Sequence, residues 1–153
     1  MLNPGDQAPS FTLSDHTGQP TTLKEFLDCG PLLLFFYPAD FSPVCTREAC
    51  LFRDRYAELA AAGVQVAGIS TNTAESHRRF GERNALPYPL LADPDKVAIR
   101  AFGVDGPLGI GLRRASFLID RDGTIRLAVR ADLRLKPHAA LIEEALAASA
   151  SES

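Results

Sequence analysis

Two cysteines, Cys45 and Cys50, are the residues of this chain whose type and spacing best suit covalent chemistry. Only the thiolate form of cysteine is a strong nucleophile, and an unperturbed thiol is roughly 3% ionised at pH 7. If Ser42 caps a helix that begins at Pro43, Cys45 lies in the first turn of that helix. The helix dipole and the free backbone N–H groups favour an anion there. The pattern therefore predicts a reactive thiol at Cys45.

The spacing of the two cysteines carries a second prediction. Five helical steps separate their Cα atoms by roughly 8–9 Å, which exceeds the ~7 Å limit for a disulfide. If both residues lie in one helix, a bond between them requires the first turns to unwind, and the end of a helix is where fraying costs least. We therefore expect a conformational change on oxidation.

The elements that position the cysteines are clear in the pattern. Residues 32–37 form the most hydrophobic stretch of the chain and predict a buried central strand. Residues 46–62 predict a helix that stops at Gly63. Residues 64–69 predict a second central strand, parallel to the first and joined to it by a right-handed crossover.

The rest of the chain continues the alternation of strands and helices. A hairpin is expected around the turn at residues 15–18, and a second one around the Asp-Gly turn at residues 121–124. Asn72 is the expected cap of a helix over residues 73–83, and Asp93 of a short helix that ends at Phe102. Residues 137–148 predict the closing helix. The pattern indicates an α/β fold: a mixed sheet with helices on both faces and an N-terminal β-hairpin, in one domain over residues 1–148 with a disordered tail at 149–153.

Composition excludes several classes of function. The 153 residues carry a net charge of −3, with Lys and Arg scattered, so no footprint for nucleic acid is expected. The longest apolar run is about a third of a membrane span, and the first residues do not form an export signal, so we expect a cytoplasmic protein. Three cysteines without a C-x-x-C pair, and three histidines far apart (His16, His77 and His138), support neither a disulfide scaffold nor a zinc site. No metal or organic cofactor is expected.

The cysteine segment resembles a known family. Pro38, Ser42 and Cys45 match the peroxiredoxin signature P-x-x-x-[TS]-x-x-C, and Cys50 is similar in position to the second cysteine of the peroxiredoxin Q, or bacterioferritin comigratory protein, branch. The resemblance extends over almost the whole chain, including the opening at residues 5–11 and the segments at 76–80, 90–93 and 114–120. It implies a thioredoxin-like fold and the reduction of hydrogen peroxide and organic hydroperoxides.

The resemblance also implies a role for each site residue. Cys45 corresponds to the peroxidatic cysteine and Cys50 to the resolving one. Arg114 corresponds to the arginine that orients thiolate and peroxide, with neighbouring Arg113 as the alternative if the register differs, and Glu48 to the residue that holds this arginine. Ser42 replaces the commoner threonine and keeps the hydroxyl that assists the peroxide, and Pro38 is expected to shield the thiolate from water.

The implied cycle converts the Cys45 thiolate to sulfenic acid, which condenses with Cys50 to an intramolecular disulfide. A dithiol protein, with thioredoxin as the first candidate, then restores both thiols. Glutathione or glutaredoxin is the alternative reductant, and Cys29 the alternative resolving cysteine. A monomer is expected, with a weak dimer as the other possibility.

Two other functions use the same cysteines. One is general thiol–disulfide exchange, against which the lack of C-x-x-C counts. The other is a redox sensor in which the unwound helix exposes a surface for a binding partner.

The remaining candidate residues have simpler interpretations. His77 is expected on the surface of its helix, His16 and His138 are expected to have no function, and residues 103–111 are expected to form a flexible loop rather than a phosphate loop, because no Gly-Lys-Ser/Thr follows.

Overall fold

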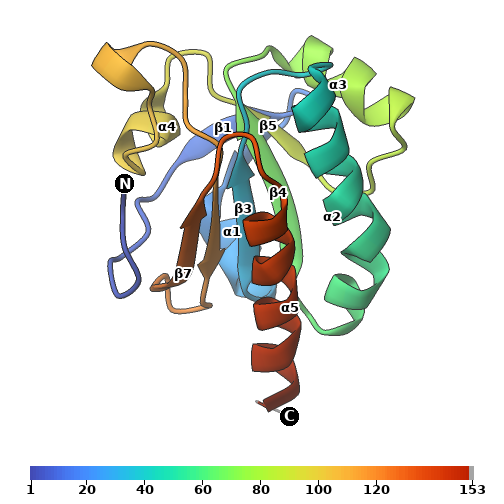
Figure 1. Ribbon diagram of the computed structural model, residues 1–153, viewed down its shortest axis with the longest axis vertical. Coiled ribbons are helices and arrows are strands. Elements are labelled where there is room, and N and C mark those ends of the chain that lie inside the picture. The colour runs from blue at the N-terminus through green and yellow to red at the C-terminus, as the bar shows by residue number, and fades with distance from the viewer. Residues whose placement is uncertain (152–153) are drawn as a thin grey trace.

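Seven strands form one mixed sheet in the computed structural model, which describes the backbone of residues 1–151 and the side chains of residues 1–149. The strands are β1 (Thr12–Asp15), β2 (Pro20–Thr22), β3 (Leu32–Phe36), β4 (Gln65–Ser70), β5 (Leu90–Ala92), β6 (Ala115–Ile119) and β7 (Ile125–Arg130). Their order across the sheet is β2-β1-β5-β4-β3-β6-β7 (Figure 1). β3 pairs parallel with β4 and antiparallel with β6. The mixed sheet and both predicted hairpins are confirmed.

Helices cover both faces of this sheet (Figure 1). On one face, Leu33 and Phe35 of β3 pack in a cluster with α2 (Pro43–Ala61), α3 (Ala74–Arg83) and α5 (Lys136–Ser151). On the other face, the alternate residues of β3 pack in a cluster with α1 (Leu23–Cys29) and α4 (Val97–Ala101). Because successive side chains of a strand point to opposite faces, the unbroken apolar run of β3 serves both clusters. All five residues of β3 are buried.

Two short elements have no counterpart among the sequence-based expectations. One is α1, where Thr22 accepts a hydrogen bond from the backbone N–H of Glu25 at 3.1 Å. This is the pattern of a capping box, so the signal was present in the chain. The other is β5, which is three residues long and pairs with β4 on one side and β1 on the other. β5 thereby joins the N-terminal hairpin to the sheet.

Two expected helix caps are corrected by the structure. α3 is capped by Thr73, whose hydroxyl accepts from the N–H of Ser76, and Asn72 lies one residue outside the helix. The helix expected to follow Asp93 begins only at Val97, because Lys96 takes a left-handed backbone conformation with φ of 57°. The Asp93 carboxylate nevertheless accepts hydrogen bonds from the N–H groups of Val97 and Ile99. It therefore serves this helix from a greater distance than expected.

The closing helix is longer than predicted. α5 begins at Lys136 and continues to Ser151, whereas the sequence indicated an end at residue 148 and a disordered tail from 149. The tail prediction is therefore wrong for residues 149–151, which are helical, and residues 152–153 lie outside the described residues. No helix within residues 1–151 is long and apolar enough to cross a membrane.

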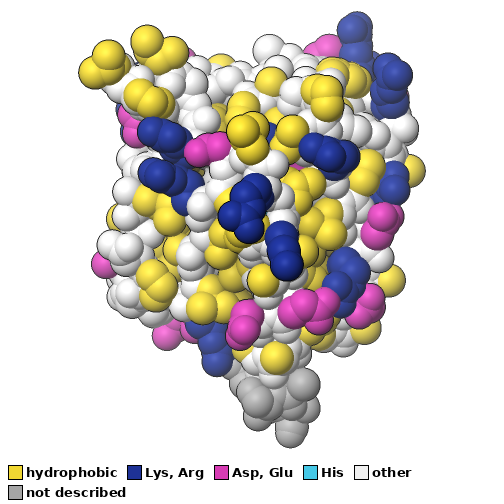
Figure 2. Space-filling view, viewed as in Figure 1, with side chains coloured by type: hydrophobic (Ala, Val, Ile, Leu, Met, Phe, Trp, Pro, Cys, Tyr) yellow, Lys and Arg dark blue, Asp and Glu magenta, His cyan; other side chains and the backbone are white. Residues whose placement is uncertain are grey.

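The loop between α4 and β6 contains local structure that the sequence pattern did not indicate. It contains a short 3-10 turn (Pro107–Gly109) and a backbone bridge between Asp105 and Leu112. The Lys96 ammonium donates to the carbonyls of Gly109 and Gly111, both at 2.8 Å. Hydrophobic side chains are visible at the upper left corner of Figure 2, where Figure 1 shows this loop. Its most exposed apolar residue is Leu108.

Candidate active site

Cys45 lies in the first turn of α2, as the sequence predicted. Ser42 is the N-cap, with extended backbone (φ −73°, ψ 148°), and Pro43 occupies the first helical position. Proline is well suited there because its fixed φ matches the helix and its missing N–H would have no helical partner. The Cys45 side chain is 1% exposed. The sulfur therefore sits in a dry position beside the positive end of a helix of 19 residues.

Arg114 reaches the sulfur from the position directly before β6, the strand that pairs antiparallel with β3. Its Nη2 donates to Cys45 Sγ at 3.1 Å. The same guanidinium donates through Nη1 to Glu48 Oε1 at 2.6 Å and through Nε to the carbonyl of Asp132 at 2.9 Å. Three acceptors, two on α2 and one in the loop after β7, thus fix the guanidinium plane, which suits the fork of donors that arginine presents. Arg113, the alternative in the sequence, instead lies 3.5 Å from Asp132 Oδ2.

Glu48 is a fully buried carboxyl one helical turn after Cys45. Its Oε1 accepts from Arg114, but its Oε2 has no hydrogen-bond partner among the described residues. Burial raises the pKa of Glu48 to about 7, and the attraction of Arg114 offsets only part of this effect. Glu48 therefore changes its charge close to neutral pH, in contact with the arginine that touches the sulfur.

His138, which the sequence left without a function, is buried behind Glu48 at the start of α5. Its Nε2 lies 3.0 Å from the carbonyl of Ala131, so Nε2 carries the proton. Burial lowers the pKa of His138, and the neutral ring then accepts at Nδ1 from the Ser116 hydroxyl at 2.7 Å. Glu48 Oε2 is 3.6 Å from the same Nδ1. Two acceptors face each other there, which adds a reason for Glu48 to hold a proton.

Ser42 and Pro38 lie on the loop between β3 and α2 that leads to Cys45. The Ser42 hydroxyl does not cap the helix. It donates to the carbonyl of Ala39 at 3.1 Å instead. The lone pairs of its Oγ are then available to accept a hydrogen bond from a bound molecule. Pro38 is exposed at the beginning of the same loop.

A buried polar network holds this loop in place, and Asp40 is its centre. The carboxylate of Asp40 accepts from the hydroxyls of Tyr37 (2.6 Å) and Ser76 (2.7 Å) and lies 2.8 Å from Nδ1 of His77. The backbone N–H of Asp40 donates to Asn72 Oδ1 at 2.9 Å. Asn72 thus supports the loop instead of capping α3. β3, β4 and α3 together fix the approach to Cys45.

The expectation that His77 lies on the surface is wrong. Its side chain is completely buried, with Nε2 3.0 Å from the carbonyl of Leu91 and Nδ1 against Asp40. A signal was present in the sequence, since His77 precedes Phe80 by three positions and residues at that spacing share a helix face. Phe80 is fully buried. The side of α3 that carries both His77 and Phe80 therefore faces the interior of the protein.

Cys50 lies in the same continuous helix as Cys45, as the spacing argument required. Both are free thiols, and Cys50 is half-buried with its Sγ 3.9 Å from Asn84 Oδ1. Helical geometry places the two Cα atoms roughly 8–9 Å apart. A bond between these sulfurs therefore requires α2 to change shape.

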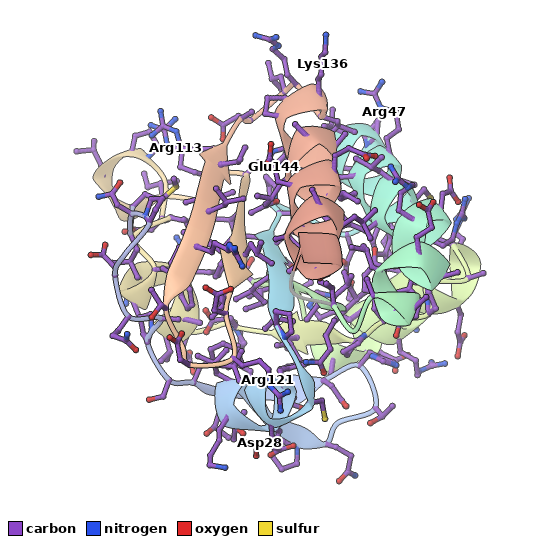
Figure 3. All side chains as sticks on the ribbon, turned by 90° about the horizontal axis from the view of Figure 1, so that it is seen from below. Asp28, Arg47, Arg113, Arg121, Lys136 and Glu144 are labelled. Atoms are coloured by element: carbon purple, nitrogen blue, oxygen red, sulfur yellow. The ribbon has the colours of Figure 1, made fainter. Side chains whose placement is uncertain are left out.

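Cys29, the third thiol, is exposed at the end of α1. It precedes β3, whereas Cys45 follows that strand, so the two lie at opposite ends of β3. Figure 3 shows the neighbouring Asp28 beside Arg121, which donates to its carbonyl at 3.1 Å. In the same view Arg47 and Lys136 project from the first turns of α2 and α5, on the other side of the molecule. Cys29 is remote from the Cys45 site.

Comparison with known proteins gives consistent matches. The family model described as "AhpC/TSA family" matches residues 4–128. Chloroplastic peroxiredoxin Q of Arabidopsis thaliana is 38% identical over 138 residues, which are 90% of this chain and 63% of that protein. The chain spans 72% of the corresponding protein of Sedum lineare. The plant relatives are therefore longer than this chain.

Solved structures match over nearly the full length. The crystal structure of peroxidoxin BcpB from Mycobacterium tuberculosis has a TM-score of 0.89 and 36% identity, covering 97% of this chain and 98% of that one. A structure of the bacterioferritin comigratory protein of Xanthomonas campestris, studied for its alkyl peroxide reduction activity, has a TM-score of 0.85 and 28% identity, covering 97% of this chain and 98% of that one. These matches confirm the thioredoxin-like fold predicted from the sequence.

Proposed function

Since this chain belongs to the AhpC/TSA family of peroxiredoxins, which are thiol-dependent peroxidases, we propose that it reduces hydrogen peroxide and organic hydroperoxides with Cys45 as the attacking residue. The observation that carries this proposal is the hydrogen bond from Arg114 to Cys45 Sγ, at 3.1 Å in a buried site. A guanidinium stabilises a thiolate, and the same group has further N–H donors for a bound peroxide.

In the first step the Cys45 thiolate attacks one peroxide oxygen, and the O–O bond breaks. The departing alkoxide or hydroxide takes up a proton, and Cys45 becomes a sulfenic acid. Full ionisation of the thiol raises the thiolate concentration about 30-fold, or roughly 2 kcal/mol. Fixed hydrogen-bond donors must supply the remaining lowering of the activation barrier by stabilising the charge that develops on the peroxide oxygens. Arg114 and the first N–H groups of α2 are these donors, and Ser42 Oγ orients the peroxide by accepting its O–H.

In the second step the sulfenic acid of Cys45 condenses with the thiol of Cys50. A disulfide forms and water leaves, so that the oxygen taken from the peroxide departs. The step requires the first turns of α2 to unwind, because both cysteines lie in one helix. Pro38 shields the sulfur from water while the helix is still folded.

In the third step a dithiol protein reduces the disulfide, and thioredoxin is the proposed reductant. The protein is proposed to act in the cytoplasm as a monomer of one domain, which includes the whole of α5. Its exchange partner reaches the disulfide after α2 has opened, since Cys45 is buried in the folded form. No nucleic acid or membrane partner is part of this proposal.

Thioredoxin-coupled turnover of hydrogen peroxide tests the proposal. The Cys45→Ser variant should show no turnover, and Cys50→Ser should consume one equivalent of peroxide and stop as the sulfenic acid. Undiminished turnover by Cys45→Ser would overturn the assignment of Cys45. Steady cycling by Cys50→Ser with thioredoxin would reassign the resolving role, with Cys29 as the next candidate.

A further inference from the structure

The segment between α3 and β5, residues 84–89, contacts α2 next to Cys50. Three polar contacts join the two. The Tyr88 hydroxyl donates to the carbonyl of Ala49 at 2.6 Å, Cys50 Sγ lies 3.9 Å from Asn84 Oδ1, and Arg53 Nη1 donates to the carbonyl of Asn84 at 2.8 Å. They cover one turn of α2, and that turn contains the cysteine that has to move.

Tyr88 is held firmly at its place. Its side chain is 2% exposed. Its ring makes an edge contact with Phe35 of β3, at 5.8 Å between centroids, and packs near Tyr56 of α2 at 6.1 Å. The hydroxyl therefore points at Ala49 from a fixed ring, and water does not reach it. If the Ala49 carbonyl moves away, this hydroxyl is left without its acceptor in a dry environment, which is unfavourable.

The side chain of Asn84 is also held in a fixed orientation. Its Nδ2 donates to the carbonyl of Phe80 at 3.0 Å, inside the last turn of α3. This bond fixes the amide so that the acceptor Oδ1 faces Cys50. A thiol is a weak donor, so the contact contributes orientation more than energy. Cys50 must leave Asn84 before it can approach Cys45.

We propose that Tyr88 and Asn84 are positioning residues that hold Cys50 in the helical state and thereby limit the rate of disulfide formation. The inference rests on the proposed function, in which Cys50 is the resolving cysteine. In the step concerned, Cys45–SOH and Cys50–SH become Cys45–S–S–Cys50 and water, so the sulfenic sulfur is reduced as the thiol is oxidised. The Tyr88–Ala49 hydrogen bond breaks before this step and forms again after the disulfide is reduced.

This arrangement has a consequence for overoxidation. While α2 is folded, a sulfenic acid at Cys45 can react with a second peroxide and become sulfinic acid, which is not reversed by thiols. Stronger contacts that hold Cys50 in the helix prolong the lifetime of the sulfenic acid, and weaker contacts shorten it. At a fixed peroxide concentration, the ratio of disulfide to sulfinic acid therefore reports how strongly these contacts hold Cys50 in the helix.

The Tyr88→Phe variant tests the inference, because it removes one hydroxyl and keeps the ring. The reduced protein is mixed with hydrogen peroxide, quenched with an alkylating agent at successive times and measured by intact mass. Loss of the Cys45 thiol should proceed as in wild type, and the disulfide should form about 2- to 12-fold faster, the range that corresponds to one net hydrogen bond. The peroxide concentration that gives half sulfinic acid should rise by the same factor.

Two further variants make the test decisive. Tyr56→Phe removes a hydroxyl from α2 while the Tyr88–Ala49 bond stays, and it should match wild type. Asn84→Ala should also accelerate disulfide formation, by a smaller factor than Tyr88→Phe because the thiol is a weak donor, and it keeps the inference testable if Tyr88→Phe folds poorly. Wild-type rates of disulfide formation in both Tyr88→Phe and Asn84→Ala would overturn the inference. If wild type itself formed no Cys45–Cys50 disulfide, the proposed function would fail first, and the two failures are thus distinguishable.

Discussion

Arg114 Nη2 donates a hydrogen bond to Cys45 Sγ across 3.1 Å, although the two residues are 69 positions apart in the chain. The pairing of β3 with β6 brings them together, since Phe36 at the end of β3 lies opposite Ala115 at the start of β6. Arg114 precedes Ala115, and the loop to Cys45 follows Phe36. The sheet register therefore sets the distance between the thiol and its cation.

Arg114→Lys should slow the reaction of Cys45 with peroxide by about 100-fold or more, the usual cost of losing a fixed donor at a developing charge. Lysine keeps the positive charge, but it cannot reach Cys45, Glu48 and Asp132 together as the guanidinium does. The second-order rate constant, measured by competition for hydrogen peroxide, checks this. Arg113→Lys is the matched control and should react as wild type does; equal loss in both variants would contradict the role of Arg114.

Glu48 should make the free energy of unfolding fall as pH rises from about 4.5 to 7. Its pKa is about 7 in the folded protein against 4.5 ordinarily. The folded state therefore binds more protons than the unfolded state inside this window, and stability falls as pH rises. Glu48→Gln should remove this contribution, which is on the order of 1–3 kcal/mol. His138, whose pKa is lowered, acts with the opposite sign, so the comparison is made between the two proteins.

Urea unfolding at several pH values between 4.5 and 8 measures this difference. The stability of Glu48→Gln relative to wild type should increase with pH and level off above about pH 7. A difference that stays constant over the whole range would contradict the raised pKa of Glu48, because the folded and unfolded states would then bind its proton equally.

His77→Ala should destabilise the fold by about 3–5 kcal/mol, because it leaves a cavity where a fully buried ring packed and removes the contacts of that ring with Asp40 and Leu91. Asp40 would keep the hydroxyls of Tyr37 and Ser76 and lose the imidazole at 2.8 Å. Ser76→Ala is the graded control, with an expected cost of about 1 kcal/mol. Thermal or urea unfolding of the reduced proteins gives both values. Equal effects of the two substitutions would mean that the His77–Asp40 contact does not anchor the loop.

Much of the site could be predicted because its signals are local. The apolar run before Pro38, the Ser42-Pro43 helix start and the five-residue spacing of the cysteines are all contained in residues 32–50. The fold class followed from the alternation of strand and helix patterns, and Arg114 followed from a family resemblance.

What the sequence did not reveal depends on contacts between distant segments. His77 and His138 are polar residues that become buried only because β5, Asp40 and Ser116 supply acceptors or donors from elsewhere in the chain. β5 is too short for a periodic pattern, and it forms because β1 and β4 flank it. The burial of these two histidines depends on contacts that exist only once the sheet has assembled, so a local sequence pattern does not predict it.

Mapping of the disulfide after one equivalent of hydrogen peroxide is the most direct test of whether Cys50 is the residue that condenses with the sulfenic acid of Cys45. The oxidised protein is alkylated, digested and sequenced by mass spectrometry, with Cys29→Ser treated in parallel. We predict a Cys45–Cys50 bond in both proteins and an alkylated Cys29 in wild type. A bond between Cys45 and Cys29, or between two copies of the chain, would contradict this prediction, and so would an oxidised protein in which Cys50 remains a free thiol.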